Sequence, residues 1–376
     1  MDVMIAVADI NTPWRRKPFE ALSEWLPVLG LAPRDVFGTW QNRPQLNSRK
    51  LSGNYREDYI TLLPGWASRF PSWTARRLWA RANQIADSAG SELSAFVVTS
   101  PHYLQLVKKA KAHVSTFYYC SDDYAQYTGW GGSVMLQMEA TVACAVTHSF
   151  FVSELLAERA VREYGVPAEN VSVSSNATDE AFLETALPIQ LLDLRARFPR
   201  LRSPLVGTIG GINERLDFDL LLECAAQREV GTLVMVGPQT DNLNDAGFQR
   251  LKDHPKCVFV GAQPHAELSK WMQLLDVALI PYRDTPLNRS CSPMRLFDHL
   301  AAGRPIIATD FCRQVINYRD VVQTAHTKFE FVQKLVALLQ AGEAESAVAA
   351  RREVARKNLW STRAQVLATK IAQPKL

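Results

Sequence analysis

The sequence predicts an α/β protein built from two doubly wound domains, each a parallel sheet with helices on both faces. Apolar, strand-like runs alternate with helical patterns in both halves of the chain. A proline-containing stretch, residues 186–203, interrupts this alternation and predicts an interdomain linker. At 376 residues the chain is long for one core and sufficient for two domains.

The first half contains six expected strands and four expected helices, in a domain predicted to span residues 1–190. The strands are expected near residues 3–9, 59–63, 94–99, 114–120, 145–149 and 171–174. The helical patterns cover residues 18–29, 72–90, 131–143 and 152–164.

The second half repeats the alternation in a domain predicted to span residues 204–355. Its strands are expected at residues 205–209, 232–236, 258–260, 277–280 and 306–308, with helices between them. Residues 343–372 read as two helical stretches joined near 358–361, and residues 356–376 form a separate C-terminal segment.

Composition indicates an ordinary globular protein. Hydrophobic residues make up 47% of the chain and charged residues 21%, with a net charge of +4. No run approaches the roughly 20 apolar residues needed to span a bilayer, and the first strand follows Met1 without a basic start or a cleavage site. Six scattered cysteines without a Cys-x-x-Cys pair favour a reducing compartment and no metal site. We therefore expect a cytoplasmic protein, which could also contact the inner face of the cytoplasmic membrane.

Residues 276–310 predict an anion-binding helix start. Ser292 can cap the helix, Pro293 suits its first position, and Gly303 can end it before the next strand. The free N–H groups of the first turn favour phosphate, and Arg295 adds a full positive charge there. This segment points to a diphosphate ligand.

A carboxylate follows on the same helix face. Asp298 lies three residues after Arg295, and a carboxylate there can accept hydroxyl protons from a ribose, while Met294 can pack on the other face. The alternative is an ordinary exposed pair behind a common helix cap.

A second candidate phosphate contact follows the strand at 205–209. Gly210 and Gly211 allow the backbone to approach a ligand closely, and Arg215 can reach the same oxygens. Taken alone, a glycine pair after a strand is more often a tight turn, and it lacks dinucleotide or Walker spacing.

Residues 292–305, SPMRLFDHLAAGRP, resemble the donor-sugar motif SPLKLFEYLAAGKP of bacterial group 1 (family 4-like) glycosyltransferases with the GT-B fold. The resemblance extends over most of the second domain. It implies two Rossmann-like domains facing across a cleft, with a tryptophan-containing C-terminal helix that crosses back to the first. It also implies a nucleotide-sugar donor, UDP- or GDP-linked, and no further cofactor. The donor-contacting residues implied are Gly210, Gly211, Arg215, Tyr282, Ser292, Pro293, Met294, Arg295 and Asp298, with Arg295 at the diphosphate and Asp298 at the ribose.

The chain departs from the family pattern at two positions. Ser290 stands where retaining members carry a glutamate, and Asp298 is one methylene shorter than the usual glutamate. The first departure leaves open whether the anomeric configuration is inverted or retained.

Asp122 and Asp123 end a predicted strand of the first domain. The carboxyl ends of parallel strands open onto the ligand crevice, so these acids lie where chemistry occurs. An inverting transferase needs a base for the acceptor hydroxyl, and we expect one of the two, with Asp122 preferred by comparison with related strands. The alternative is a turn or helix cap. The resembled fold usually works without a metal, and two adjacent strand-end acids point to different sides.

The acceptor side of the first domain is expected to include the loop after its first strand. Trp14, Arg15 and Arg16 occupy the position of a Trp-x-Arg-Pro sequence in related transferases, and His102 follows another strand. A solvated basic turn and a structural histidine are the alternatives.

Residues 43–81 carry eight basic residues against Glu57 and Asp58, with Trp66, Trp73 and Trp79 interleaved. Such a face could rest on anionic lipid headgroups, or it could combine buried tryptophans with solvated arginines. Nucleic-acid binding ranks last because the whole chain is only weakly basic.

The resemblance implies a metal-independent glycosyltransferase of the hexosyltransferase type. It would move a sugar to a hydroxyl of a glycan or lipid-linked acceptor, as in the synthesis of bacterial surface polysaccharides. A nucleotide-sugar epimerase of similar fold and a non-catalytic sugar-nucleotide or glycan-binding protein are the alternatives. A nicotinamide dehydrogenase is disfavoured because no Gly-x-Gly-x-x-Gly follows the first strand.

Overall fold

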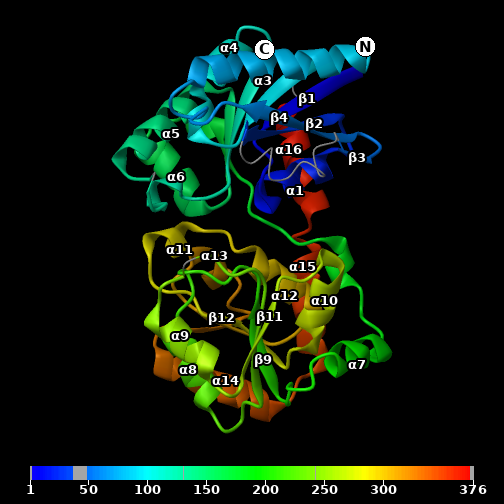
Figure 1. Ribbon diagram of the computed structural model, residues 1–376, viewed down its shortest axis with the longest axis vertical. Coiled ribbons are helices and arrows are strands. Elements are labelled where there is room, and N and C mark those ends of the chain that lie inside the picture. The colour runs from blue at the N-terminus through cyan, green and yellow to red at the C-terminus, as the bar shows by residue number, and fades with distance from the viewer. Residues whose placement is uncertain (1, 37–48, 130, 242, 373–376) are drawn as a thin grey trace. The chain divides into compact units, whose positions relative to one another are not determined.

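A computed structural model describes residues 2–36, 49–129, 131–241 and 243–372 (Figure 1). The chain divides into two compact units, described separately below. Among the described residues, unit 1 comprises those up to Asn176 and those from Trp360 onward, and unit 2 is Ala177–Leu359. The sequence places the boundaries at 190, 204 and 355. The first boundary of unit 2 lies at Ala177, earlier than predicted, because Phe182, Leu194 and Leu201 are buried in the core of unit 2.

Unit 1 contains an eight-stranded sheet in the order β3-β4-β2-β1-β5-β6-β7-β8. Its strands are parallel except β3, which runs antiparallel to β4 at the edge. The strands are β1 (Asp2–Ala8), β2 (Val28–Asp35), β3 (Arg49–Ser52), β4 (Tyr55–Leu62), β5 (Ser91–Val98), β6 (Ser115–Cys120), β7 (His148–Phe151) and β8 (Val171–Val173).

Helices surround this sheet, and one of them comes from the C-terminal segment. The α-helices are α1 (Pro13–Leu22), α3 (Pro71–Ser88), α4 (Leu104–Ala110), α5 (Ser133–Ala145), α6 (Glu154–Arg162) and α16 (Trp360–Ile371). Helix α16 packs beside α1 and places Ala364, Leu367 and Ile371 in the core of unit 1 (Figure 1). The unit therefore combines two separate parts of the sequence.

Four elements of unit 1, α1, β2, β3 and α4, differ from the sequence prediction. Residues 18–29 were expected to be helical, but α1 begins at Pro13 and ends at Leu22, and Val28 already lies in strand β2. Residues 28–32 of β2 are all buried, as in a strand covered on both faces, where the period-2 signal disappears. Strand β3 and helix α4 are short and were not predicted.

Unit 2 contains a six-stranded parallel sheet in the order β11-β10-β9-β12-β13-β14. Its strands are β9 (Leu205–Ile209), β10 (Thr232–Val236), β11 (Cys257–Gly261), β12 (Val277–Ile280), β13 (Ile306–Thr309) and β14 (Gln323–Ala325). Its α-helices are α7 (Pro188–Ala196), α8 (Phe218–Ala226), α9 (Ala246–Asp253), α10 (His265–Leu274), α11 (Pro286–Ser290), α12 (Met294–Ala302), α13 (Arg313–Ile316), α14 (Lys328–Ala341) and α15 (Glu345–Arg356). The two sheets with their helices confirm the predicted α/β class.

The stretch expected to be a linker contains a helix. Pro188 starts α7, since proline is pre-organised for the first helical turn, and Leu194 anchors it. The prolines read as breakers therefore flank a helix of unit 2. No helix in the described part of the chain is long and apolar enough to cross a membrane.

His299 on α12 gives unit 2 a predictable sensitivity to acid. Its side chain is fully buried, and neither ring nitrogen has a hydrogen-bond partner among the described residues. Burial, with Arg295 nearby, lowers the pKa of His299 to about 3. The unfolded chain therefore binds a proton near pH 6.5 that the folded chain rejects, so stability is complete above that pH and falls as the pH drops toward 3.

Between pH 7 and 5 this histidine should cost the fold about 2 kcal/mol. Urea unfolding of unit 2 at the two pH values, compared for wild type and His299→Phe, measures the effect, and the variant should lose less stability on acidification. His326→Phe, at a side chain 73% exposed, is the control. Equal pH dependence in His299→Phe and wild type would contradict the assignment.

Candidate functional site

The topology of unit 2 defines where a ligand crevice opens. From β9 the chain proceeds to β10 and β11 on one side, and β12 returns to the other side of β9. Ligands bind in open α/β sheets at the carboxyl ends of the strands beside such a switch. The residues following β9 and β12 are therefore the first candidates for contact.

The turn after β9 requires glycine. Gly210 has a φ of 119°, a conformation that side chains rarely adopt. A Cβ atom on Gly237, after β10, would lie 2.0 Å from the carbonyl oxygen of Gly210. The two loops thus touch through bare backbone, and the predicted glycine turn lies at the carboxyl edge of the sheet.

Arg295 is fixed against this turn. It lies in the first turn of α12, and its guanidinium donates to Thr208 Oγ1 and to the carbonyl of Gly211, both at 2.9 Å. A planar guanidinium held at two points is pre-organised for bidentate contact with phosphate. The structure therefore brings together the two candidate phosphate contacts, which lie far apart in the sequence.

Tyr282 and Arg215 complete the cluster. The guanidinium carbons of Arg215 and Arg295 lie 5.5 and 5.4 Å from the centre of the Tyr282 ring. Arg215 donates to Asn288 Oδ1 at 2.8 Å, and Asn288 Nδ2 returns a bond to the Arg215 carbonyl at 3.0 Å. Burial raises the pKa of Tyr282, and the two arginines oppose this shift.

Asn288 was missed by the sequence prediction. It is fully buried in α11 and also donates to the carbonyl of Arg283. An asparagine near the start of a short helix carries no motif, and only its proximity to the Ser-Pro helix could have suggested a role. Because it holds Arg215 from both sides, we assign it a positioning role.

Two donor-side residues, Ser292 and Pro293, take positions that differ in detail from the prediction. Helix α12 begins at Met294, because the backbone of Pro293 is extended, with φ −76° and ψ 116°. Pro293 rather than Ser292 therefore holds the cap position. Gly303 ends the helix in the left-handed region with a φ of 78°, as predicted. One oxygen of Asp298 accepts a hydrogen bond from Thr178 at 2.8 Å.

Ser290 occupies the place of the family glutamate. It ends α11, is 3% exposed, and its hydroxyl donates to the carbonyl of Pro286 at 2.9 Å. The hydroxyl is bonded within its own helix, and a serine at this position supplies no carboxylate.

Unit 1 has its own switch point between β1 and β5, where β2 and β6 lie on opposite sides. Asp9 directly follows β1 and is the one non-glycine residue of positive φ in the described chain, at 72°. Its carboxylate pairs with Arg15 at 2.5 Å and accepts from Asn11 Nδ2 at 3.1 Å. The Arg15 guanidinium lies 5.2 Å from the centre of the Tyr124 ring. A strained backbone held by several contacts is typical of functional sites.

The predicted acceptor residues separate into two groups. His102 lies beside this cluster, where burial and the charge of Arg15 lower its pKa and Asp9 partly opposes the shift. Arg15 and His102 are thus brought together. Arg16 turns instead toward Glu57 at 3.8 Å, and Trp14 is half-buried in the first turn of α1. Asp9 was not predicted, although an acid directly after the first strand was visible.

The two candidate bases have different surroundings. Asp123 is fully buried, and its two carboxylate oxygens accept hydrogen bonds from the two terminal nitrogens of Arg159, both at 2.9 Å. Asp122 is 8% exposed and accepts from the Tyr127 hydroxyl at 2.8 Å and from the backbone N–H of Asp123 at 3.0 Å. The bidentate ion pair gives Asp123 a structural role, and Asp122 remains the better candidate for proton transfer.

The tryptophans of residues 43–81 pack inside unit 1. Trp66 stacks on Tyr103 with ring centres 5.8 Å apart, and Trp79 stacks on His113 at 5.2 Å. All three tryptophans lie against the hydrophobic core. Residues 43–48, with Arg43, lie outside the described residues. The three tryptophans are half-buried against the core, which is closer to the alternative of packed tryptophans with solvated arginines.

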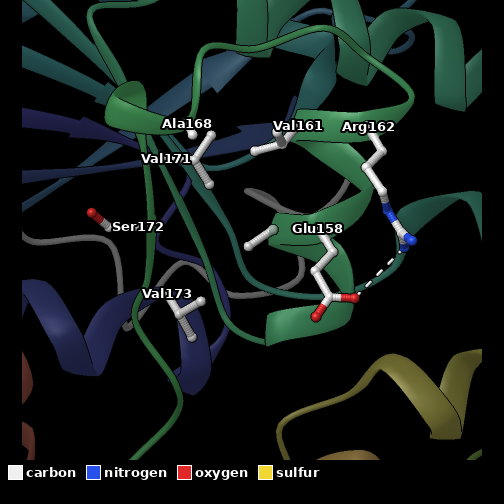
Figure 2. A pocket seen from close by; sticks show the side chains of 8 residues that line it. Glu158, Val161, Arg162, Ala168, Val171, Ser172 and Val173 are labelled. Atoms are coloured by element: carbon white, nitrogen blue, oxygen red, sulfur yellow. Dashed lines mark ion pairs between the residues drawn. The ribbon is translucent and has the colours of Figure 1, made fainter.

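An open pocket of about 300 Å³ lies between α6 and β8 of unit 1, apart from the switch point of that unit. Figure 2 shows its aliphatic lining, including Val161, Val171 and Val173, with the Glu158–Arg162 ion pair at one side. None of the predicted site residues lines it. Among the residues that the structure places, no three histidine, cysteine or acidic side chains converge as metal ligands would.

The two doubly wound units, with an arginine fixed at the switch point of the second, define the architecture of GT-B glycosyltransferases. Residues 203–341 match the family described as Glycosyl transferases group 1. The chain is also 33% identical, over 148 residues, to the putative teichuronic acid biosynthesis glycosyltransferase TuaH of Bacillus subtilis. This alignment covers 39% of the chain and about a third of the length of that relative.

Solved structures of the same fold match nearly the whole chain. HepE from Anabaena, in complex with UDP and glucose, has a TM-score of 0.72 at 14% identity, covering 98% of this chain and 99% of HepE. Sucrose-phosphate synthase from Thermosynechococcus elongatus has a TM-score of 0.74 at 14% identity, covering 99% of each chain. The predicted GT-B fold and the resemblance to group 1 glycosyltransferases are confirmed.

Proposed function

We propose that this protein is a glycosyltransferase that moves a sugar from a nucleoside-diphosphate sugar to a hydroxyl of a glycan or lipid-linked acceptor. The observation that carries the proposal is the Arg295 guanidinium, held by Thr208 and Gly211 against a glycine turn at the switch point of unit 2. This arrangement suits a diphosphate. UDP is the first nucleotide to test, because the HepE structure holds it, and GDP is the second.

The rest of the donor site follows from the same cluster. Arg215, positioned by Asn288, would add a second cation near the diphosphate, and the backbone N–H groups at the start of α12 would contribute beside Arg295. Both guanidiniums lie close to the ring of Tyr282. Asp298 is proposed to accept hydrogen bonds from the ribose hydroxyls with its carboxylate, one oxygen of which also accepts from Thr178.

The reaction proposed for these groups needs one base and one site for the leaving diphosphate. Asp122 would accept the proton of the acceptor hydroxyl as its oxygen attacks the anomeric carbon. Arg295 and the helix start would stabilise the charge that develops on the departing diphosphate, so the mechanism proposed requires no metal. Arg15, His102 and Asp9 would line the acceptor side.

A role in bacterial surface polysaccharide synthesis is proposed from the similarity to TuaH. We place the protein in the cytoplasm, with its acceptor at the inner face of the membrane. An epimerase and a non-catalytic sugar-nucleotide-binding protein are the remaining alternatives. One experiment distinguishes them from the proposal, because only a transferase moves labelled sugar from the donor to a lipid or glycan.

Thermal stabilisation by a panel of nucleoside diphosphates and their sugars should show one nucleotide that binds. At a concentration about 100 times its dissociation constant, that ligand adds roughly 2.7 kcal/mol of stability. Arg295→Ala should weaken binding by about tenfold to 100-fold, because charge-assisted hydrogen bonds are lost. Arg295→Lys should recover only part of the loss, since it keeps the charge without the fork.

Arg250→Ala is the matched control, because Arg250 pairs with Asp219 on an exposed surface of the same unit. It should bind the nucleotide like the wild type. If no nucleotide stabilises the wild type, or if Arg295→Ala binds equally well, the proposed donor site is wrong.

A further inference from the structure

Helix α7 of unit 2 presents apolar side chains to solvent. Leu187, at its N-cap, is 60% exposed, and Ile189 and Leu192 are 59% and 62% exposed. Ile189 and Leu192 are three residues apart and therefore share one helix face. The single fully buried residue of the helix, Leu194, lies on the opposite side. Most of the large aliphatic side chains of this helix therefore face solvent, where polar side chains are usual.

The helix is firmly attached despite this exposure. It packs beside α10, where Gln273 Oε1 accepts from the backbone N–H of Ala186 at 2.9 Å and Glu267 pairs with Arg197 at 2.7 Å (Figure 1). The exposed aliphatic groups therefore stand on a fixed element. Grouped exposed aliphatic side chains of this kind mark interaction sites.

The charges next to the helix indicate what covers this face. Residues 187–202 contain four arginines, at positions 195, 197, 200 and 202, against the single acid Asp193. Arg200 and Arg202 are exposed, and Arg197 has an exposed fraction of 52% even in its ion pair. An apolar helix face followed by a cluster of arginines combines the two attractions that hold an interfacial helix on an anionic bilayer.

We propose that α7 and its arginines form a docking surface for a bilayer containing anionic phospholipid. Ile189, Leu192 and Leu187 would enter the headgroup–acyl boundary, and the arginines would contact lipid phosphates. A stable protein–protein interface buries about 800 Å² per partner, which three aliphatic side chains do not supply. Contact with a membrane surface needs only a small group of apolar side chains beside basic ones. The surface would hold the enzyme where a lipid-linked acceptor is found.

This surface is separate from the donor cluster of the same unit, so its test does not depend on the transferase proposal. Sedimentation of the full chain with vesicles measures binding, using phosphatidylcholine alone and phosphatidylcholine mixed with phosphatidylglycerol. The wild type should bind the anionic vesicles more strongly than the neutral ones. Raising the salt concentration should weaken binding, because the arginine contribution is screened.

The double variant Ile189→Ser, Leu192→Ser should reduce the partition coefficient on anionic vesicles by about tenfold or more, because two buried aliphatic side chains are lost. Arg195→Ala, Arg200→Ala should reduce it mainly at low salt. Phe329→Ser, which removes an aromatic residue 71% exposed on α14, is the matched control and should bind like the wild type. Unchanged far-UV circular dichroism and an unchanged urea-unfolding midpoint show that each variant is folded.

Two outcomes would overturn the proposal. The first is wild-type protein that leaves anionic vesicles unbound, or a double variant that binds them as well as the wild type. The second is a wild-type dimer in analytical ultracentrifugation that becomes a monomer in the double variant, which would assign the face to a second copy of the chain. Neither outcome would change the result of the nucleotide screen.

Discussion

Replacing Asp122 by asparagine is expected to lower turnover by about 100-fold to 10,000-fold, the range that general-base catalysis contributes. The substitution keeps the size of the side chain and an oxygen that can accept from Tyr127, but it removes the basic carboxylate. Stabilisation by the nucleotide sugar should stay unchanged, because Asp122 lies in unit 1 and the proposed donor site in unit 2. The measurement is release of the nucleoside diphosphate in the presence of a bacterial membrane lipid extract as acceptor.

Tyr127→Phe is the companion variant. It removes the hydroxyl that donates to Asp122 Oδ2 and leaves the carboxylate in place, so turnover should fall by only about tenfold or less. Full activity of Asp122→Asn would remove Asp122 from the mechanism. An equal loss in both variants would indicate that the orientation of the carboxylate, and not its basicity, limits the rate.

Replacing Asp123 by alanine is expected to destabilise unit 1 by about 3–5 kcal/mol, because it leaves Arg159 largely buried without its partner. The side chain of Arg159 is 20% exposed and that of Asp123 fully buried. The hydrogen bonds that Arg159 donates to Asp123 are the largest cause of the raised pKa of Arg159. Urea unfolding followed by the fluorescence of the unit 1 tryptophans measures the change.

A double variant, Asp123→Leu with Arg159→Met, should lose less stability than the two single variants added together, since it leaves no unpaired buried charge. This cycle separates structure from catalysis for the two adjacent acids. If Asp123→Ala folds with near-normal stability and has lost all turnover, Asp123 is the base and the roles assigned here are exchanged.

The sequence predicted the fold well where elements are long or continuous. The five strands expected in unit 2 and the strands expected at residues 94–99 and 114–120 of unit 1 are all present. They could be predicted because buried parallel strands give uninterrupted apolar runs in the sequence. Strand β2 was hidden because only residues 23–27 separate its apolar residues from helix α1, so the two apolar segments were read as one helical pattern. The edge strands β3 and β14 are too short to give a periodic signal.

The candidate site was predictable where it is contiguous in sequence. Arg295 was found because the helix start, the charge and the glycine end lie within one short motif. Its contact with Thr208 joins residues 87 positions apart, so no local pattern contains it. Asn288 and Asp9 were missed for a related reason, since their roles depend on the groups packed around them and not on their neighbours in the chain.

The position of α16 has a consequence for how the protein is made. The chain leaves unit 1 after Asn176 and re-enters it at Trp360, so unit 2 is an uninterrupted insertion in unit 1. During synthesis the ribosome releases the whole of unit 2 before the helix that covers α1 has emerged. Although domains generally fold in order of synthesis, here the later unit can reach its native state while the earlier one still lacks Ala364, Leu367 and Ile371 from its core. Truncation before Trp360 would therefore damage the beginning of the protein, not its end.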